Sequence, residues 1–159
     1  MSWIDIPHSH VTFGVFAGSS AGASVAVAPA DLSFLRYKLL DGDTVVIDFR
    51  IAKAFFTPTA ATITGLTMQL KVPFAAPYFP ALGSPSNFMD HGQSYTNACV
   101  LVPDPGSPHH TAGYVTLLND PAHHVTLMIS SVPGYSVNAG GLGVVGAFGQ
   151  LTMEAITKK

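Results

Sequence analysis

Residues 43–51 read Asp43-Thr44-Val45-Val46-Ile47-Asp48-Phe49-Arg50-Ile51. Apolar side chains occupy every second position of this stretch, so in an extended chain they share one face. That face holds Val45, Ile47, Phe49 and Ile51, and the opposite face holds Thr44, Val46, Asp48 and Arg50. A period of two in β-branched and aromatic residues predicts a strand with one buried face.

The preceding segment, Leu32–Leu40, alternates in the same way. Phe34, Arg36 and Lys38 fall on one face, and the apolar residues between them fall on the other. Asp41-Gly42 joins the two segments, and this dipeptide between alternating segments is a strong signal for a tight hairpin. The two segments are therefore predicted to pair as antiparallel neighbours.

Further short segments have the strand period, and none has the period of a helix. They are His10–Ala17, Ala23–Ala28, Ala61–Pro73, Ser94–Val102, Ala112–Leu118, His123–Ser130 and Val144–Ile156. We predict an all-β fold, an antiparallel, jelly-roll-like β-sandwich of 8–9 strands with little or no helix. We expect residues 1–159 to form one domain, with residues 1–9 as an N-terminal arm able to dock onto a neighbouring subunit.

Charge is scarce in this chain. Only 10% of the residues are charged, the net charge is −2, and no Lys or Arg occurs from Val72 to Thr157. A soluble domain usually has about 25% charged residues. The low charge suggests a surface covered by other copies, and we expect a homotrimer. A nucleic-acid footprint would be basic. A membrane helix would need a run of about 18 apolar residues, and the sequence has none. We therefore expect neither nucleic acid nor membrane as a partner.

Two segments are predicted as long loops, Phe74–Gly92 and Pro103–Thr111. The first begins with an apolar stretch, for which two interpretations stay open: a docking surface, or a plug over one end of the sandwich. We expect the trimer axis near Val144–Ile156 and Ala112–Leu118. The predicted interface residues are Phe74, Tyr78, Phe79, Val144, Phe148, Leu151 and Met153.

Histidine is the strongest enzymatic lead. His8 and His10 would point to one face of a strand, and together with His91 they are weak candidates for metal ligands. Motifs for a catalytic nucleophile or a phosphate-binding loop are absent from the sequence. Cys99 lies in an apolar segment and is expected to be a small buried hydrophobe. We expect no enzyme activity, no bound cofactor and no metal.

Four segments, in order, resemble small virion β-domains of tailed bacteriophages, jelly rolls of tumour-necrosis-factor-like type. They are Trp3-Ile4-Asp5-Ile6-Pro7, the hairpin from Phe34 to Phe49, the strand from Leu66 to Pro73, and the last strand from Gly149 to Ile156 with its Glu154. The resemblance implies a tight trimer on a fibre tip or a capsid surface. No shaft precedes the domain in this sequence, so we expect a capsid decoration (cement) protein or a head spike.

The leading interpretation is thus a structural virion protein, made in the host cytoplasm, that stabilises capsomer contacts. Its expected partners are its own copies and the major capsid protein or another virion protein. The alternative is a receptor- or glycan-binding fibre or spike tip, with a host glycan as partner and the two long loops as recognition elements. A third interpretation is a cupin-like metalloenzyme that uses His8, His10 and His91.

Overall fold

The computed structural model describes residues 2–15, 23–40, 44–58, 63–64, 67–73, 75–79, 96–103, 111–118, 122–131, 136–137 and 141–154. Its strands and short 3₁₀ helices (η) are β1 (Ile4–Asp5), η1 (His8–His10), β2 (Thr12–Val15), β3 (Ala23–Ala26), η2 (Pro29–Asp31), β4 (Leu32–Leu40), β5 (Thr44–Pro58), β6 (Ile63–Thr64), β7 (Thr67–Pro73), β8 (Thr96–Pro103), β9 (Thr111–Leu118), β10 (His123–Ser131), β11 (Ser136–Val137) and β12 (Gly143–Glu154). No helix among these residues is long and apolar enough to cross a membrane.

One large antiparallel sheet forms most of the fold. Its ten strands follow the order β1-β4-β5-β12-β8-β9-β10-β7-β2, and β3 pairs with β5 beside this path. The central strand β5 carries β4 and β3 on one edge and β12 on the other. A separate two-stranded sheet pairs β11 with β6.

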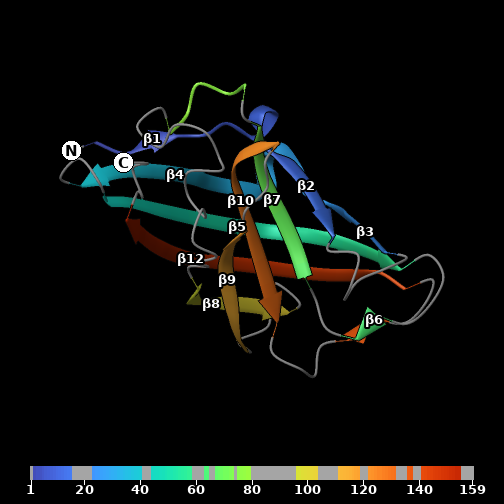
Figure 1. Cartoon of the computed structure of the whole chain (residues 1–159). Helices are drawn as coiled ribbons and strands as arrows, with labels where there is room; N and C mark the ends of the chain where they lie inside the picture. Colours follow the sequence, from blue (N-terminus) through green and yellow to red (C-terminus); the bar gives the residue numbers. More distant parts are fainter. Residues whose placement is uncertain are drawn as a thin grey trace.

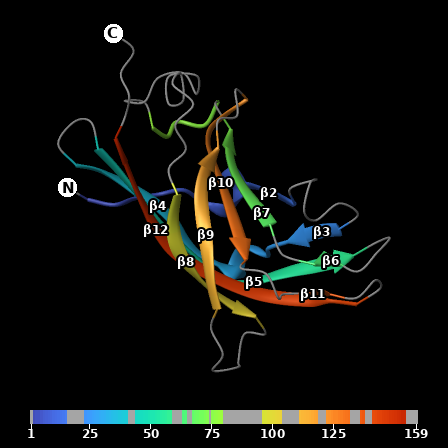
Figure 2. The same ribbon diagram turned by 60° about the horizontal axis from the view of Figure 1, so that its bottom comes forward.

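The large sheet curls so that its distant strands meet. β2, at one end of the strand order, lies next to β3, which is attached to β5. In Figures 1 and 2, β7, β9 and β10 cross steeply over β5 and β12, forming two layers. The predicted all-β antiparallel sandwich is confirmed, and nine of its strands have four or more residues.

The core lies between the two layers. On β5 the buried residues Val45, Ile47, Phe49 and Ile51 face inward, as their alternation predicts. Leu127 and Ile129 of β10 face them from the other layer, and both are almost fully buried. Each large apolar side chain buried in this way contributes about 1.5–3 kcal/mol relative to an exposed one.

The segment 75–79 lies over one end of this core. Tyr78 is 8% exposed and Phe79 is fully buried. The Phe79 ring lies 4.1 Å from the ring of Tyr37 on β4, and its backbone N–H donates to the Tyr37 hydroxyl at 3.3 Å. This part of the apolar loop is therefore a core plug. Tyr78 and Phe79 therefore belong to the chain's own core and do not form part of a docking surface.

The N-terminal segment packs against the same chain. β1 pairs with β4, and the backbone N–H of the buried residue Ile6 donates to the Leu35 carbonyl at 2.8 Å. Residues 8–10 form a 3₁₀ turn, closed by bonds from His10 N to Pro7 O and from Val11 N to His8 O. The strand predicted from His10 begins at Thr12 instead, because Pro7 opens this turn.

Candidate functional site

The outward-facing side of β4, β5 and β12, called here the outer face, gathers aromatic and charged residues. Antiparallel register aligns them in rows, since residues directly opposite one another share a face. The rows are Phe34–Arg50–Phe148, Arg36–Asp48–Gln150 and Lys38–Val46–Thr152. The outer face is thus built from three strands whose other side chains form the core.

Arg36 is held at the centre of a cation–aromatic cluster on the outer face. Its guanidinium donates to Asp48 Oδ2 from Nε at 3.0 Å and from Nη2 at 2.8 Å. The guanidinium carbon lies 4.3 Å from the centroid of the Phe34 ring and 4.6 Å from that of Trp3. Lys38 Nζ also lies 4.6 Å from the Trp3 centroid. These contacts hold the indole of the N-terminal segment against β4.

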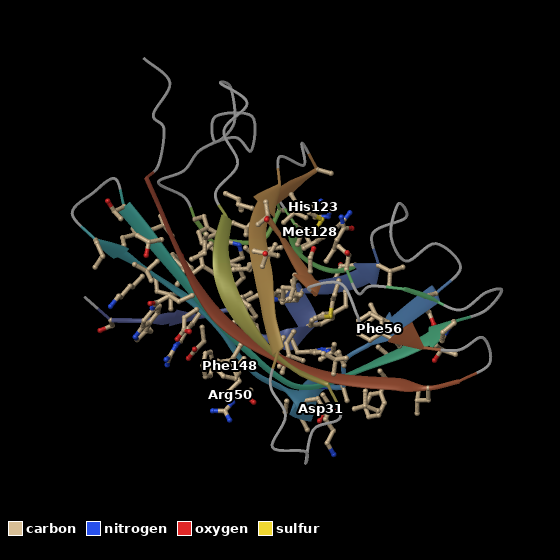
Figure 3. All side chains as sticks on the ribbon, turned by 90° about the horizontal axis from the view of Figure 1, so that it is seen from below. Asp31, Arg50, Phe56, His123, Met128 and Phe148 are labelled. Atoms are coloured by element: carbon tan, nitrogen blue, oxygen red, sulfur yellow. The ribbon has the colours of Figure 1, made fainter. Side chains whose placement is uncertain are left out.

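A groove lies beside this cluster. It has a volume of about 360 Å³ and is lined by Phe34, Asp48, Phe49, Arg50, Phe148, Gly149 and Gln150. The register places Arg50 between the two phenylalanines Phe34 and Phe148. Figure 3 shows Arg50 and Phe148 next to one another, projecting away from the sandwich and from His123 and Met128 on its other side.

Apolar side chains continue along β12 beyond the groove. Leu142, just before the strand, is 62% exposed, and the half-buried Val144 is paired with the half-buried Phe55 of β5. We call Leu142, Val144 and Phe55 the apolar stripe. Phe148, 40% exposed, lies between the stripe and the polar part of the groove. Tyr114 of β9 is 50% exposed. In the sheet, β9 lies two strand spacings from β12, a distance of about 10 Å.

The structure divides the predicted interface residues. Val144 and Phe148 are on the outer face. Leu151 pairs with Ile47, faces inward and is 1% exposed, so it belongs to the core with Tyr78 and Phe79. Met153 is described only by its backbone pairing with Val45, and Phe74 lies outside the described residues. Because side chains alternate along a strand, Phe148 and Leu151 cannot lie on the same face.

Trp3, Phe34 and Arg50 are site residues that the sequence pattern does not single out. Alternation in Leu32–Leu40 did place Phe34, Arg36 and Lys38 on one face. It does not show that β12 brings Phe148 into the same row.

The candidate metal ligands have other partners. His8 Nε2–H donates to the Val27 carbonyl at 2.6 Å, and its ring stacks on Phe13 with centroids 5.3 Å apart. A hydrogen bond of 2.8 Å joins His10 Nδ1 to the Tyr78 hydroxyl. The expectation that both rings share one face of a strand is wrong, because the 3₁₀ turn directs them to different partners. His91 lies outside the described residues.

Within the described ranges, no group of three or more His, Cys, Asp and Glu residues could hold a metal ion. Burial, aided by the neighbouring Tyr37, raises the pKa of Tyr78 above its ordinary value of 10.0. The Tyr78 hydroxyl therefore keeps its proton and serves as a structural hydrogen-bonding group.

Comparison with known proteins gives a distant structural likeness. No protein-family model and no curated protein matches this chain. One similar structure is avian reovirus sigmaC117-326, at 8% identity and a TM-score of 0.35, covering 96% of this chain and 64% of that one. Another is the C-terminal receptor-binding domain of the avian reovirus fibre sigmaC, at 12% identity and a TM-score of 0.37, covering 92% and 77%. A Zn crystal form of that domain has a TM-score of 0.33 at 12% identity, covering 85% and 76%.

Proposed function

We propose that this chain is a non-enzymatic structural protein of a virion surface. It assembles as a homotrimer and acts as a capsid decoration protein that stabilises capsomer contacts. Its partners are its own copies and the major capsid protein or another virion protein.

The apolar stripe is the observation that carries this proposal. Val144 and Phe55 lie on the paired strands β12 and β5, and Leu142 lies just before β12. The other side of this strand pair already carries the core residues Val145, Ala54 and Phe56. Apolar side chains on a regular sheet face gain about 25 cal/mol for each Å² that association removes from water. A stripe with no role in the core of its own subunit is suited to contact between copies.

The low charge of the chain supports the same conclusion. Of the seven Lys and Arg residues, none lies between Val72 and Thr157, the span that includes β8, β9, β10 and β12. Contacts between these strands and another surface would require little desolvation of cationic side chains. They would also depend only weakly on salt concentration, because screening acts on charges.

The mass of the purified chain in solution tests the homotrimer. Light scattering over a wide range of concentrations should give three times the chain mass of 16.6 kDa. Quantitative gel analysis of purified particles should then show the protein in many copies on the shell. A monomer at every concentration would contradict the proposal.

A second candidate function is recognition of a receptor or glycan by a fibre or spike tip. The groove between Phe34 and Phe148 favours it, since the groove combines aromatic surfaces with Arg50 and Asp48. The predicted recognition loops lie mostly outside the described residues. Binding of the isolated protein to host cells or to immobilised glycans tests this function.

A further inference from the structure

Arg50 is a cation without a partner among the described residues. The neighbouring carboxylate, Asp48, accepts both of its bonds from Arg36. Arg50 itself is exposed and makes no hydrogen bond or ion pair within the described part of the chain. The pair of Arg36 and Asp48 has no net charge, so the described residues of the groove carry one uncompensated positive charge, that of Arg50. This charge suits a ligand group with a single negative charge, such as a carboxylate.

The walls of the groove indicate what that carboxylate is attached to. Phe148 and the part of the Phe34 ring that Arg36 does not cover present apolar surface on either side of Arg50. Asp48 Oδ1 is not used by Arg36 and can accept a hydrogen bond, and Gln150 adds an amide to the lining. A pyranose ring has apolar C–H faces for the aromatic rings and hydroxyls for the polar groups. The volume of about 360 Å³ is at the small end of the range for ligand sites.

Other carboxylate-bearing ligands fit the groove less well. An extended peptide binds a sheet by adding a strand to a free edge, but β5 is paired with β4 and β12 on its two edges at this point. A phosphate ester carries up to two negative charges, and the Asp48 carboxylate beside Arg50 would repel the second. Nucleic acid needs several cations in a row, and among the described residues that line the groove Arg50 is the one cation.

We propose that the groove between Phe34 and Phe148 binds a carboxylate-bearing sugar. The carboxylate lies on the Arg50 guanidinium, the ring faces contact the two phenylalanines, and a hydroxyl donates to Asp48. This inference rests on the second candidate function, recognition of a glycan, and it names the ligand class. The self-association through the apolar stripe does not require Arg50.

Titration of the full chain with a matched pair of glycosides tests the site. Methyl glucuronide and methyl glucoside differ only at C6, where a carboxylate replaces a hydroxymethyl group, and the methyl glycoside of N-acetylneuraminic acid adds a second acidic sugar. Saturation-transfer NMR detects binding, and a titration gives the Kd. We expect both acidic glycosides to bind, and the neutral glucoside to bind at least ~10-fold more weakly, as the loss of one charge-assisted hydrogen bond implies.

Three variants separate the site from general effects. Arg50→Gln should weaken the binding of the acidic glycosides at least ~10-fold, and Phe148→Ala should weaken it several-fold. The matched control is Lys53→Gln, which removes an exposed cation from the same strand but outside the groove lining, and it should leave binding unchanged. Circular dichroism establishes that each variant is folded.

Several outcomes would overturn the inference. The first is that the folded wild-type chain shows no saturable binding of either acidic glycoside. The second is that Arg50→Gln binds them as tightly as the wild type does. The third is that acetate binds as tightly as the glycosides, which would make the groove a general anion site. Light scattering on the same samples separates the two proposals. A trimer that binds no acidic sugar contradicts only the ligand, whereas a monomer that binds one contradicts only the decoration trimer.

Discussion

Phe79 and Tyr37 are joined twice, by a backbone-to-hydroxyl hydrogen bond of 3.3 Å and by ring contact at 4.1 Å. Phe79 has a φ of 58°, in the left-handed region that a bulky residue rarely adopts. The cost of this conformation, about 1–2 kcal/mol, is offset by the complete burial of the ring and by the bond to Tyr37. The plug over the core therefore depends on the hydroxyl as well as on apolar contact.

Replacing Tyr37 with Phe keeps the ring and removes the acceptor of that hydrogen bond. The Phe79 N–H is then buried without a partner, which costs about 1–3 kcal/mol. We expect the urea midpoint to fall accordingly. Tyr114→Phe is the matched control, because Tyr114 is 50% exposed and should tolerate the same change. Equal stability of the Tyr37→Phe variant and the wild type would show that the bond contributes nothing.

The raised pKa of Tyr78 predicts loss of stability in alkali. The folded chain holds the Tyr78 proton at pH values where the unfolded chain, with a pKa of about 10, releases it. Because the native state then binds more protons, the free energy of unfolding falls as pH rises above about 10. Below that pH both states keep the proton, so Tyr78 adds no pH dependence to the stability. Thermal melts from pH 8 to 11 should show the fall in the wild type and less of it in Tyr78→Phe. Parallel curves for the two proteins would argue against this cause.

The ion pair between Arg36 and Asp48 should stabilise the fold only modestly. Its side chains are 32% and 18% exposed, so solvent screens the attraction. A double-mutant cycle with Arg36→Gln and Asp48→Asn should give a coupling energy of about 0.5–1 kcal/mol. The coupling should shrink in 1 M salt, where the screening length is about 3 Å. A coupling that is unchanged by salt would mean that solvent does not screen the pair as its exposure implies.

Thr126 offers a stabilising substitution. Its side chain is 1% exposed, and Oγ1 has no hydrogen-bond partner among the described residues. Valine has nearly the same shape without the buried hydroxyl, so Thr126→Val should raise the free energy of unfolding by about 1 kcal/mol. Chemical denaturation measures the change. Thr152→Val, at an exposed position, should change stability by less than about 0.5 kcal/mol. A destabilised Thr126→Val variant would show that the hydroxyl has a partner.

The apolar stripe predicts how the trimer can be disrupted. Leu142→Glu and Val144→Glu place a charge in the proposed contact, where its desolvation disfavours association. The mass from light scattering should fall towards 16.6 kDa, with the circular dichroism spectrum retained. Thr152→Glu adds the same charge to the polar end of the outer face and should leave the trimer intact. Trimers in all three variants would exclude the stripe as the contact.

Alternation in the sequence located the strands well, but it missed the second half of β5. The prediction ended at Ile51, whereas β5 runs to Pro58. The reason is a bulge: Ala147 pairs with Ile51 but Val145 pairs with Ala54, so β5 has one extra residue between these pairs. Ala52 and Lys53 are both exposed, and the inward series resumes out of phase at Ala54 and Phe56.

The candidate site was less predictable because it depends on which strands are neighbours. Alternation places Phe34 and Arg50 on the outward faces of a hairpin, and the hairpin itself could be predicted from Asp41-Gly42. Phe148 comes from a strand almost a hundred positions further along the chain, and only the pairing of β12 with β5 brings it beside Arg50. Leu151 is a predicted interface residue, although its position in the alternation directs it to the core, where it is 1% exposed.

The position of β12 between β5 and β8 also has a consequence for biosynthesis. A ribosome makes the chain from its N-terminus, so β5 and β8 emerge long before the strand that joins them. Until residues 143–154 follow, each of the two strands exposes an unpaired edge, and such edges pair readily with other chains. Nascent chains on one messenger RNA thus carry open strand edges close to one another, and completion of the large sheet awaits the synthesis of β12.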